Sequence, residues 1–434
     1  MAAQSRSRSV RVVRILFLTT DFIWPADSGG RVRTLSQLRV LSSLPAVTSI
    51  RLFSVYETEI PIEHREALRR EIPKLELADP VFHPVHLFRH PRYVPRVAWL
   101  RVASGVPYIA GKWDSPSVRA AICRELMSDD YDVVWLNGLG VGHYLSLIHE
   151  CAPLARVVLD QHNVESDRFL QFAQRSRGPK RLVAAAEWRA ARRFEGDVLR
   201  RVDAVGAISD DDARAYRALA GIEALTVPQV MAPLPWKEST HQQARLCWIG
   251  SLSWGPNALG LDWFCSRVWP LIRERLPQAT CEIVGSGLPM DKKGKPVAHP
   301  EWQVPGVTTI GRVDDLAPVY ARSTVMVAPI LGGAGIRIKL LEAFRHGLPT
   351  VTTPDGAAGL PIEPGRETFV ESTAEAFARR AVALATSSAL RAGMRKAGYA
   401  FLERHNRLAD AQAAVGALLG LEPQAAAADE RVVA

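Results

Sequence analysis

Short apolar runs alternate with longer amphipathic segments through most of this chain of 434 residues. Runs of this length predict buried parallel strands, and segments with apolar residues three and four positions apart predict helices. The alternation occurs in two successive series along the chain. The sequence therefore predicts an α/β protein with two doubly wound, Rossmann-like domains. The clearest strand candidates are Arg14–Thr19, Thr48–Val55, Tyr131–Leu136, Arg156–Asp160 and Val202–Ser209 in the first half, and Arg245–Ile249 and Val325–Ile330 in the second.

The two series are separated by the segment Pro228–Gln243, which contains three prolines and predicts an interdomain linker. The helical periodicity predicts one long basic helix over Ser166–Arg201, another helix over Leu259–Leu276, and two closing helices from Thr373 onward. The predicted organisation is a disordered arm (residues 1–10), a first domain (11–228), the linker (229–244), a second domain (245–388), a C-terminal helix (389–420) and a frayed Ala-rich tail (421–434).

One stretch of the second half carries the clearest candidate chemistry. The apolar run Val325–Ile330 is followed by a glycine-rich turn and by a helix that begins near Ile336. Residues three and four apart are neighbours on a helix, so Lys339, Glu342 and His346 share a face. A cation, a carboxylate and the free N–H groups of a helix start suit a ligand with phosphates and vicinal hydroxyls. Each feature alone is more typical of an ordinary turn or a solvated helix face.

Taken together, these features resemble the C-terminal signature of the retaining GT-B glycosyltransferases, specifically the family 4-like group (glycosyl transferases group 1). One departure is Ala334, which stands where the wider superfamily has the first of two glutamates. The residues that carry the resemblance are Gly333, Gly335, Lys339, Glu342, Ala343, Gly347, Pro349 and Val351.

The resemblance implies a GT-B fold, in which the two domains face a central cleft and the C-terminal helix crosses back to the first domain. It implies a metal-independent hexosyltransferase of polysaccharide or glycoconjugate biosynthesis. Such an enzyme moves a sugar from a UDP- or GDP-linked donor, bound by the second domain, to an acceptor held by the first. The acceptor class stays open between a glycan, a lipid carrier and a small molecule. Transfer is expected to retain the anomeric configuration and to need no cofactor.

The resemblance and the positions of residues at strand ends together nominate the site. His162 follows the strand Arg156–Asp160, and Gly29 and Gly30 lie between the first strand and the first helix. The expected catalytic residues are His162, Arg337 and Lys339. The expected donor-binding residues are Gly29, Gly30, Ser251, Asn257, Gly285, Gly311, Arg312, Val313, Gly333, Ala334, Gly335, Ile336 and Glu342.

Composition indicates in which cellular compartment the protein acts and which ligands it binds. The net charge of +9 comes from 54 basic and 45 acidic side chains, and no nucleic-acid-binding module accompanies it. The five cysteines form no CxxC pair, and no run reaches the ~20 apolar residues of a membrane helix. We therefore expect a cytoplasmic protein. Arginines alternate with aromatic and apolar residues over Arg89–Arg101. This pattern predicts a patch that contacts an anionic membrane or faces the acceptor, or else an ordinary loop and helix with snorkelling arginines.

Three other classes are weighed against this one. The spacing of Gly138, Gly140 and Gly142 is GxGxG, so a dinucleotide-binding dehydrogenase is disfavoured. A GT-B sugar-nucleotide 2-epimerase would need acid and base groups in both domains and no acceptor. A non-catalytic GT-B partner subunit is compatible with Ala334, whereas Lys339 and Glu342 disfavour it.

Overall fold

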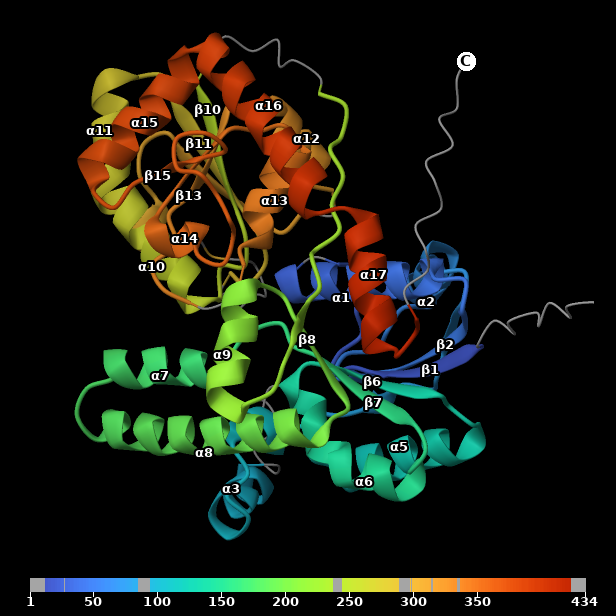
Figure 1. Cartoon of the computed structure of the whole chain (residues 1–434). Coiled ribbons are helices and arrows are strands. Elements are labelled where there is room, and N and C mark those ends of the chain that lie inside the picture. Colours follow the sequence, from blue (N-terminus) through green and yellow to red (C-terminus); the bar gives the residue numbers. More distant parts are fainter. Residues whose placement is uncertain are drawn as a thin grey trace, which may run out of the picture.

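The computed structural model describes residues 12–26, 28–84, 94–236, 244–288, 297, 299–313, 315–333 and 336–422. Two α/β domains lie one above the other, and two stretches of chain connect them (Figure 1). Each domain is built on one parallel sheet, so the predicted pair of doubly wound domains is confirmed. Among the described residues, no helix is both long enough and apolar enough to cross a membrane.

The first domain has a seven-stranded parallel sheet in the order β4-β2-β1-β6-β7-β8-β9, and β3 pairs with β5 beside it. Its strands are β1 (Val13–Leu18), β2 (Val47–Phe53), β3 (Val55–Tyr56), β4 (Leu75–Leu77), β5 (Val81–Phe82), β6 (Val133–Asn137), β7 (Arg156–Asp160), β8 (Ala204–Ala207) and β9 (Leu225–Thr226). Its helices are α1 (Gly29–Ser43), α2 (Ile62–Glu71), α3 (Val94–Ala103), α4 (Tyr108–Gly111), α5 (Pro116–Ser128), η3 (Leu139–Tyr144), α6 (Leu145–Cys151), α7 (Glu165–Arg175), α8 (Pro179–Arg201) and α9 (Asp210–Ala220).

The second domain has a six-stranded parallel sheet in the order β12-β11-β10-β13-β14-β15. Its strands are β10 (Arg245–Ile249), β11 (Thr280–Val284), β12 (Val307–Gly311), β13 (Val325–Ala328), β14 (Thr350–Thr352) and β15 (Phe369–Val370). The helices that follow the linker are α10 (Gly255–Trp263), η4 (Phe264–Val268), α11 (Trp269–Arg275), η5 (Pro300–Trp302), α12 (Ala317–Arg322), α13 (Ile338–Arg345), α14 (Pro354–Ala357), α15 (Ala374–Thr386), α16 (Ser388–His405) and α17 (Leu408–Leu418).

Both faces of each sheet are covered, which explains the continuous apolar runs of the strands. Along β1, Ile15 and Phe17 pack into one buried cluster, while Leu16 and Leu18 pack into the cluster on the opposite face. Successive side chains of a strand point to opposite faces, so a strand buried on both sides is apolar at every position. The same division separates the two clusters of the second domain.

Two helix predictions are corrected. The basic helix expected over Ser166–Arg201 is a hairpin of two helices, α7 and α8, because Gly178 turns the chain at φ +59° and Pro179 starts the second helix. The helix expected over Leu259–Leu276 begins earlier, at Gly255, and contains the π-helical turn η4 just before Pro270. Proline has no N–H to donate to the preceding turn, which accounts for the irregularity there.

The end of the chain contains three helices where two were expected. The third helix, α17, separates from α16 at Asn406 and packs against α1 of the first domain. Its Val415 and Leu418 join the buried cluster around β1, and the Leu418 carbonyl accepts a hydrogen bond from Arg156 at 2.8 Å. Figure 1 shows this crossing beside the extended segment that follows β9. The C-terminal segment thus returns to the first domain through α17 alone.

The two crossing segments are tied to each other where they pass between the domains. The Asn406 amide donates to the Gln229 carbonyl at 2.5 Å, and the Asn406 carbonyl accepts from the Met231 N–H at 3.1 Å. Of the predicted linker, residues 237–243 lie outside the described chain, as do residues 1–11 and 423–434.

Candidate active site

The second-domain sheet and α13 converge on the side chain of Lys339. The ammonium Nζ donates to Asn257 Oδ1 at 2.9 Å and lies 4.6 Å from the ring centroid of Trp248. Asn257 is held in turn, because its amide donates to the Ser251 carbonyl at 2.7 Å. Burial, together with the nearby charge of Arg337, lowers the pKa of Lys339 to about 7. Within the described parts of the chain, Lys339 forms no ion pair with a carboxylate, so its charge is available to an anionic ligand.

The loops that follow β10, β11 and β12 are pressed together beside this ammonium. A Cβ atom on Gly250 would lie 2.6 Å from Lys339 Nζ, and one on Gly285 would lie 1.7 Å from the Gly250 carbonyl oxygen. The Gly285 N–H donates to the Gly311 carbonyl at 2.8 Å, and Gly311 has a φ of +82° that favours glycine. Adjacent strands therefore bring Gly285, Gly311 and Ser251 to one edge, although they are distant in sequence.

Arg312 and Val313 continue this edge beyond β12. The Arg312 side chain is exposed, whereas Val313 is half-buried and packs against the cluster that contains α13. Ile336 is likewise half-buried against that cluster. Ala334 and Gly335 lie outside the described residues, so their predicted contacts with a donor stay predictions.

Arg337 supports the glycine turn from within. Its guanidinium donates to the carbonyls of Gly332 at 3.1 Å, Gly333 at 2.8 Å and Asp355 at 3.2 Å, and it lies 5.3 Å from the ring centroid of Trp254. Burial lowers the pKa of Arg337 to about 10. The Asp355 carboxylate meanwhile accepts from the Gly332 N–H at 2.6 Å. These contacts make Arg337 a group that positions the turn in this structure.

Glu342 lies one turn along α13 from Lys339, as the helical spacing predicted. Its carboxylate is 3.9 Å from His346 Nε2, and that imidazole stacks on Tyr320 with ring centroids 4.2 Å apart. Burial raises the pKa of Glu342 and lowers the pKa of His346 to about 4. Since an imidazole with this pKa is neutral at neutral pH, His346 does not neutralise the Glu342 carboxylate there. The carboxylate thus keeps its capacity to accept hydrogen bonds from a ligand.

On the first-domain side, His162 sits on a buried polar network. His162 Nε2 is 3.0 Å from Asn137 Oδ1, and the Asn137 amide donates to Thr19 and Thr34 at 3.1 and 3.0 Å. Because Asn137 Oδ1 can only accept, the proton of the neutral imidazole is on Nε2, and Nδ1 is left as an acceptor. Burial lowers the pKa of His162 to about 4, against the opposing effect of Asp160.

A buried ion pair supports the same strand end. Arg33 and Asp160 are both fully buried, with Arg33 Nη2 3.1 Å from Asp160 Oδ1, and Arg33 also donates to the Val227 carbonyl at 2.8 Å. The Asp160 carboxylate in turn is 3.8 Å from His162 Nε2. The pair links α1, β7 and the chain after β9, so it holds His162 in place through three elements.

The domains meet around the glycine turn. The Gly333 N–H donates to Gln171 Oε1 of α7 at 2.8 Å, and a Cβ on Gly29 would lie 3.8 Å from the Ile338 side chain. Gly29 and Gly30, expected in a loop, form the first turn of α1, which Ser28 caps through the Arg31 N–H at 3.5 Å. This expectation is corrected. The serine is a good N-cap, and it starts the helix one residue before the glycines.

Several residues of this region were missed by the sequence analysis. Trp248 and Trp254 read as ordinary core residues, and Gln171 lay within the expected basic helix. Asp355 alone had a recognisable signal, since it follows β14 at the same sheet edge as the glycine turn. Their roles come from contacts between segments far apart in the chain.

The geometry can be compared with known proteins. Residues 243–387 match the family model described as glycosyl transferases group 1. A 44.6 kDa protein of the cps region of Klebsiella pneumoniae is 22% identical over 377 residues, which cover 86% of this chain and 90% of that protein.

Solved structures of low sequence identity share the fold. HepE from Anabaena, in complex with UDP and glucose, superposes with a TM-score of 0.65 at 13% identity, covering 94% of this chain and 100% of that one. TarM from S. aureus, in a complex that contains UDP, has a TM-score of 0.68 at 9% identity with the same coverage. WaaG, a glycosyltransferase involved in lipopolysaccharide biosynthesis, has a TM-score of 0.62 at 16% identity, again covering 94% and 100%.

Residues 243–387 are therefore similar to the glycosyl transferases group 1, and the whole chain has the GT-B fold. The resemblance drawn from the glycine turn and the helix after it is confirmed at this level. The roles of the individual residues stay predictions.

Proposed function

We propose that this protein transfers a sugar from a nucleotide diphosphate sugar to an acceptor held against the first domain, with retention of configuration and without a metal. The observation that carries the proposal is the buried ammonium of Lys339, which lies at a glycine-lined sheet edge and forms no ion pair with any described carboxylate. HepE, which shares the fold, has been solved with UDP and with UDP-glucose, and this favours UDP over GDP as the nucleotide.

Lys339 is assigned to the diphosphate of the donor. Negative charge grows on that group as the glycosidic bond breaks, so a fixed cation stabilises the transition state more than the ground state. Asn257 and Trp248 hold the ammonium without neutralising it. The remaining positions at the sheet edge, among them Ser251, Gly285 and Gly311, would face the nucleotide.

Glu342 is assigned to the two ribose hydroxyls. Its carboxylate lies on the same helix as Lys339. The distance of 3.9 Å to His346 Nε2 is too long for a hydrogen bond. Ribose hydroxyls do not change during the reaction, so this contact would contribute to donor binding rather than to the chemical step.

His162 and Arg337 receive different roles. The neutral His162, with Nδ1 as acceptor, is suited to hold a hydroxyl of the donor sugar or the acceptor. Arg337 would act indirectly, by keeping the N–H groups of the glycine turn in place for the donor. We assign no residue as nucleophile.

No particular observation favours the sugar-nucleotide 2-epimerase or the non-catalytic partner subunit. Both alternatives share the fold, so the test is functional. An epimerase would convert the nucleotide sugar without an acceptor, and a partner subunit would bind nucleotide without turnover.

Contact with an anionic membrane is a second part of the proposal. The structure favours a different surface for this contact than the segment Arg89–Arg101. Arg89 and Arg92 lie outside the described residues. Arg96 and Arg101 are bonded to Asp114 at 2.5 Å and Glu187 at 2.9 Å, so they stabilise the fold. Exposed arginines for which no ion pair is found among the described residues gather on α8: Arg189, Arg192, Arg193 and Arg200.

Exposed apolar side chains accompany these arginines. On α3, Trp99 is 63% and Val102 is 87% exposed, and on α8, Leu182 is 75% exposed. Figure 1 shows α3 and α8 on the side of the first domain that faces away from the second. Basic and apolar side chains on one face suit peripheral binding to the inner face of a membrane in a cytoplasmic protein.

The first prediction concerns the charge of Lys339. Because its pKa is about 7 in the unliganded protein, a rise in pH removes the proton that the diphosphate attracts. The Kd of UDP, measured by calorimetry, should increase by up to about fivefold from pH 7 to pH 8, since the protonated fraction of Lys339 falls from about a half to about a tenth. Lys339→Arg, whose guanidinium stays charged, should give a flat profile over the same range.

Asn257→Asp provides a matched isosteric change for this experiment. A carboxylate at the position of Asn257 Oδ1, 2.9 Å from Nζ, would pair with Lys339 and raise its pKa. UDP should then bind more weakly at pH 7, and the dependence on pH should disappear. An unchanged slope in Lys339→Arg would refute the assignment.

The second prediction concerns Glu342 and identifies the donor. A thermal-shift screen of UDP- and GDP-sugars should single out one donor, and Glu342→Gln should weaken its binding by about 1–3 kcal/mol, the range for a hydrogen bond to a charged group. A 2′,3′-dideoxyribose analogue should bind equally poorly to the wild type and to Glu342→Gln. Wild-type affinity in the variant would contradict the ribose assignment.

The third prediction concerns metal. Among the described residues, the one group of three acidic or histidine side chains close enough to share an ion is Asp262, His299 and Glu301. Asp262 there accepts from the Trp302 indole at 2.8 Å. Since Lys339 supplies the charge at the sheet edge, transfer activity should survive EDTA. Loss of turnover in EDTA, restored by Mg²⁺ or Mn²⁺, would show that the metal-free mechanism is wrong.

The fourth prediction concerns the membrane. Vesicles with about a third of anionic lipid should bind the protein in sedimentation assays, and salt should release it as the charges are screened. The double variant Arg192→Gln/Arg193→Gln should bind several-fold less. The matched control Arg267→Gln/Arg275→Gln, which removes two exposed arginines of the second domain, should bind like the wild type. Equal binding to neutral vesicles argues against an electrostatic surface.

A further inference from the structure

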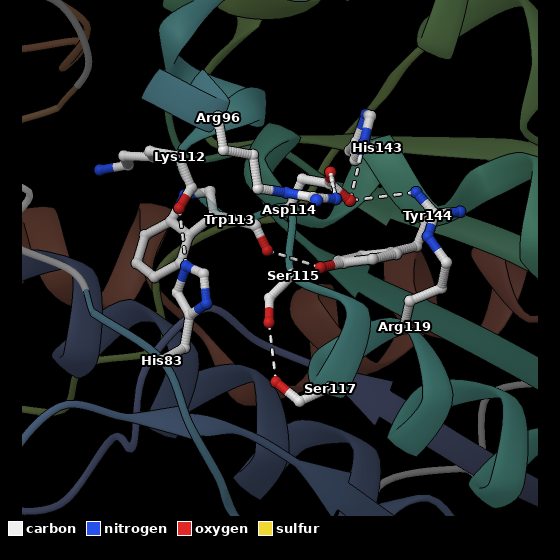
Figure 2. A network of polar contacts seen from close by, with 10 residues as sticks. All are labelled: His83, Arg96, Lys112, Trp113, Asp114, Ser115, Ser117, Arg119, His143 and Tyr144. Carbon is white, nitrogen blue, oxygen red and sulfur yellow. Dashed lines mark hydrogen bonds and ion pairs between the residues drawn. The ribbon is translucent and has the colours of Figure 1, made fainter. Parts of the chain in front are cut away.

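The short loop between α4 and α5 is fixed from several sides (Figure 2). The buried Asp114 carboxylate is 2.5 Å from the Arg96 guanidinium, 3.0 Å from that of Arg119 and 3.3 Å from His143 Nε2. Although burial alone would raise it, the bonds from His143 and Arg96 hold the pKa of Asp114 well below its usual range. Asp114 is therefore a permanent anchor for this loop.

Trp113 and the backbone on either side are held equally firmly. The Tyr144 hydroxyl donates to the Trp113 carbonyl at 2.5 Å, and His83 Nε2 lies 2.6 Å from the Lys112 carbonyl. A Cβ on Gly140 would be only 2.8 Å from the Trp113 indole nitrogen, so the ring is in close contact with η3. These contacts lock the Trp113 ring in one orientation.

Lys112 uses this rigid ring as a support. Its ammonium lies 4.6 Å from the Trp113 ring centroid and 5.7 Å from that of Tyr108. Figure 2 shows the Lys112 side chain extending away from Asp114, the nearest carboxylate of the loop. Cation–π contacts keep an ammonium in place without neutralising it. The Lys112 side chain is only partly exposed, and this burial lowers its pKa.

The carboxylates in electrostatic range of Lys112 already have other cations. Asp21 and Glu165 both act on Lys112, and Arg168 acts against them. Asp21 is 3.1 Å from Arg31 Nε, and Glu165 is 2.7 Å from Arg168 Nη1. Each of these two carboxylates is thus close to an arginine, and within the described chain Lys112 has no ion pair of its own.

The Lys112 ammonium lies on the first-domain side of the region between the domains. Asp21 follows β1, and Glu165 begins α7 just after β7 and His162. The same helix α7 reaches the glycine turn of the second domain through Gln171. In parallel sheets the carboxyl ends of the strands form the ligand-binding edge.

We propose that Lys112 is an anion subsite for the acceptor, which would carry a phosphate or a carboxylate. The proposal rests on the proposed function, since the first domain holds the acceptor there. A preformed, poorly solvated ammonium favours a charged group over a hydroxyl, because only a group of opposite charge would neutralise it. Lys112 would therefore determine specificity and take no part in bond breaking.

The test uses the full chain saturated with UDP, so that Lys339 is occupied, and three probes in calorimetric titrations: glucose 6-phosphate, glucuronate and methyl glucoside. At least one of the two anions should bind the wild type ten or more times tighter than the neutral glycoside. A preference for the first identifies a phosphate, and a preference for the second a carboxylate. Lys112→Met should abolish this preference, and Lys112→Arg should restore part of it.

The matched control is Lys396→Met, which removes one exposed lysine of α16 and should keep the full preference for anions. Equal binding of all three probes by the wild type, or an unchanged preference in Lys112→Met of native thermal stability, overturns the proposal. If Lys112→Met is unstable, Lys112→Arg is compared with the wild type instead. Because arginine keeps the positive charge, a complete loss of anion preference in Lys112→Arg would contradict an electrostatic subsite. Failure of the wild type to bind any nucleotide sugar would instead reject the proposed function, and the same titrations without UDP would still decide on Lys112.

Discussion

The candidate site depends on the buried ammonium of Lys339, which forms no ion pair with a carboxylate of the described residues. A buried charge is costly unless something pairs with it or solvates it, and here an amide oxygen and an aromatic face do so only in part. The result is a depressed pKa and an affinity for anions. The glycines at the ends of β10, β11 and β12 leave space around this ammonium for a ligand. A side chain on Gly250 would occupy the space beside the ammonium, and one on Gly285 would separate the two loops.

The first domain differs from the second in how its buried charges are arranged. Its charged groups at the strand ends are mostly paired and buried, as Arg33 and Asp160 show at 0% exposure each. A buried pair of this kind is weak evidence for stability, because desolvation offsets much of the attraction. Its role here is geometric, since it joins α1 to β7 and leaves His162 neutral on a fixed amide. Against that background of paired charges, the single ammonium of Lys112 stands out as a group for a ligand.

The connection between the domains has consequences for motion. Both crossing segments pass the same point, where Asn406 is hydrogen-bonded to Gln229 and Met231. Beyond this point, α17 is packed on the first domain and α16 on the second. A change in the angle between the domains would therefore be absorbed near Asn406 and the linker. The Gln171–Gly333 hydrogen bond would be among the contacts that such a change breaks.

The sequence by itself determined the two parallel α/β domains, the glycine turn and the pairing of Lys339 with Glu342 on one helix face. These features depend on residues within one strand or helix, whose periodicity is set by local backbone geometry. Tertiary structure alone decided that Asn257 would hold Lys339, that Arg337 would turn inward to brace the turn, and that Gln171 would reach Gly333. It also decided that Lys112 would have no ion pair among the described residues, while Arg31 and Arg168 lie beside the nearby carboxylates. The partners in each case come from different elements, and which polar groups meet at a sheet edge depends on strand order and on how the helices pack, which no local pattern encodes.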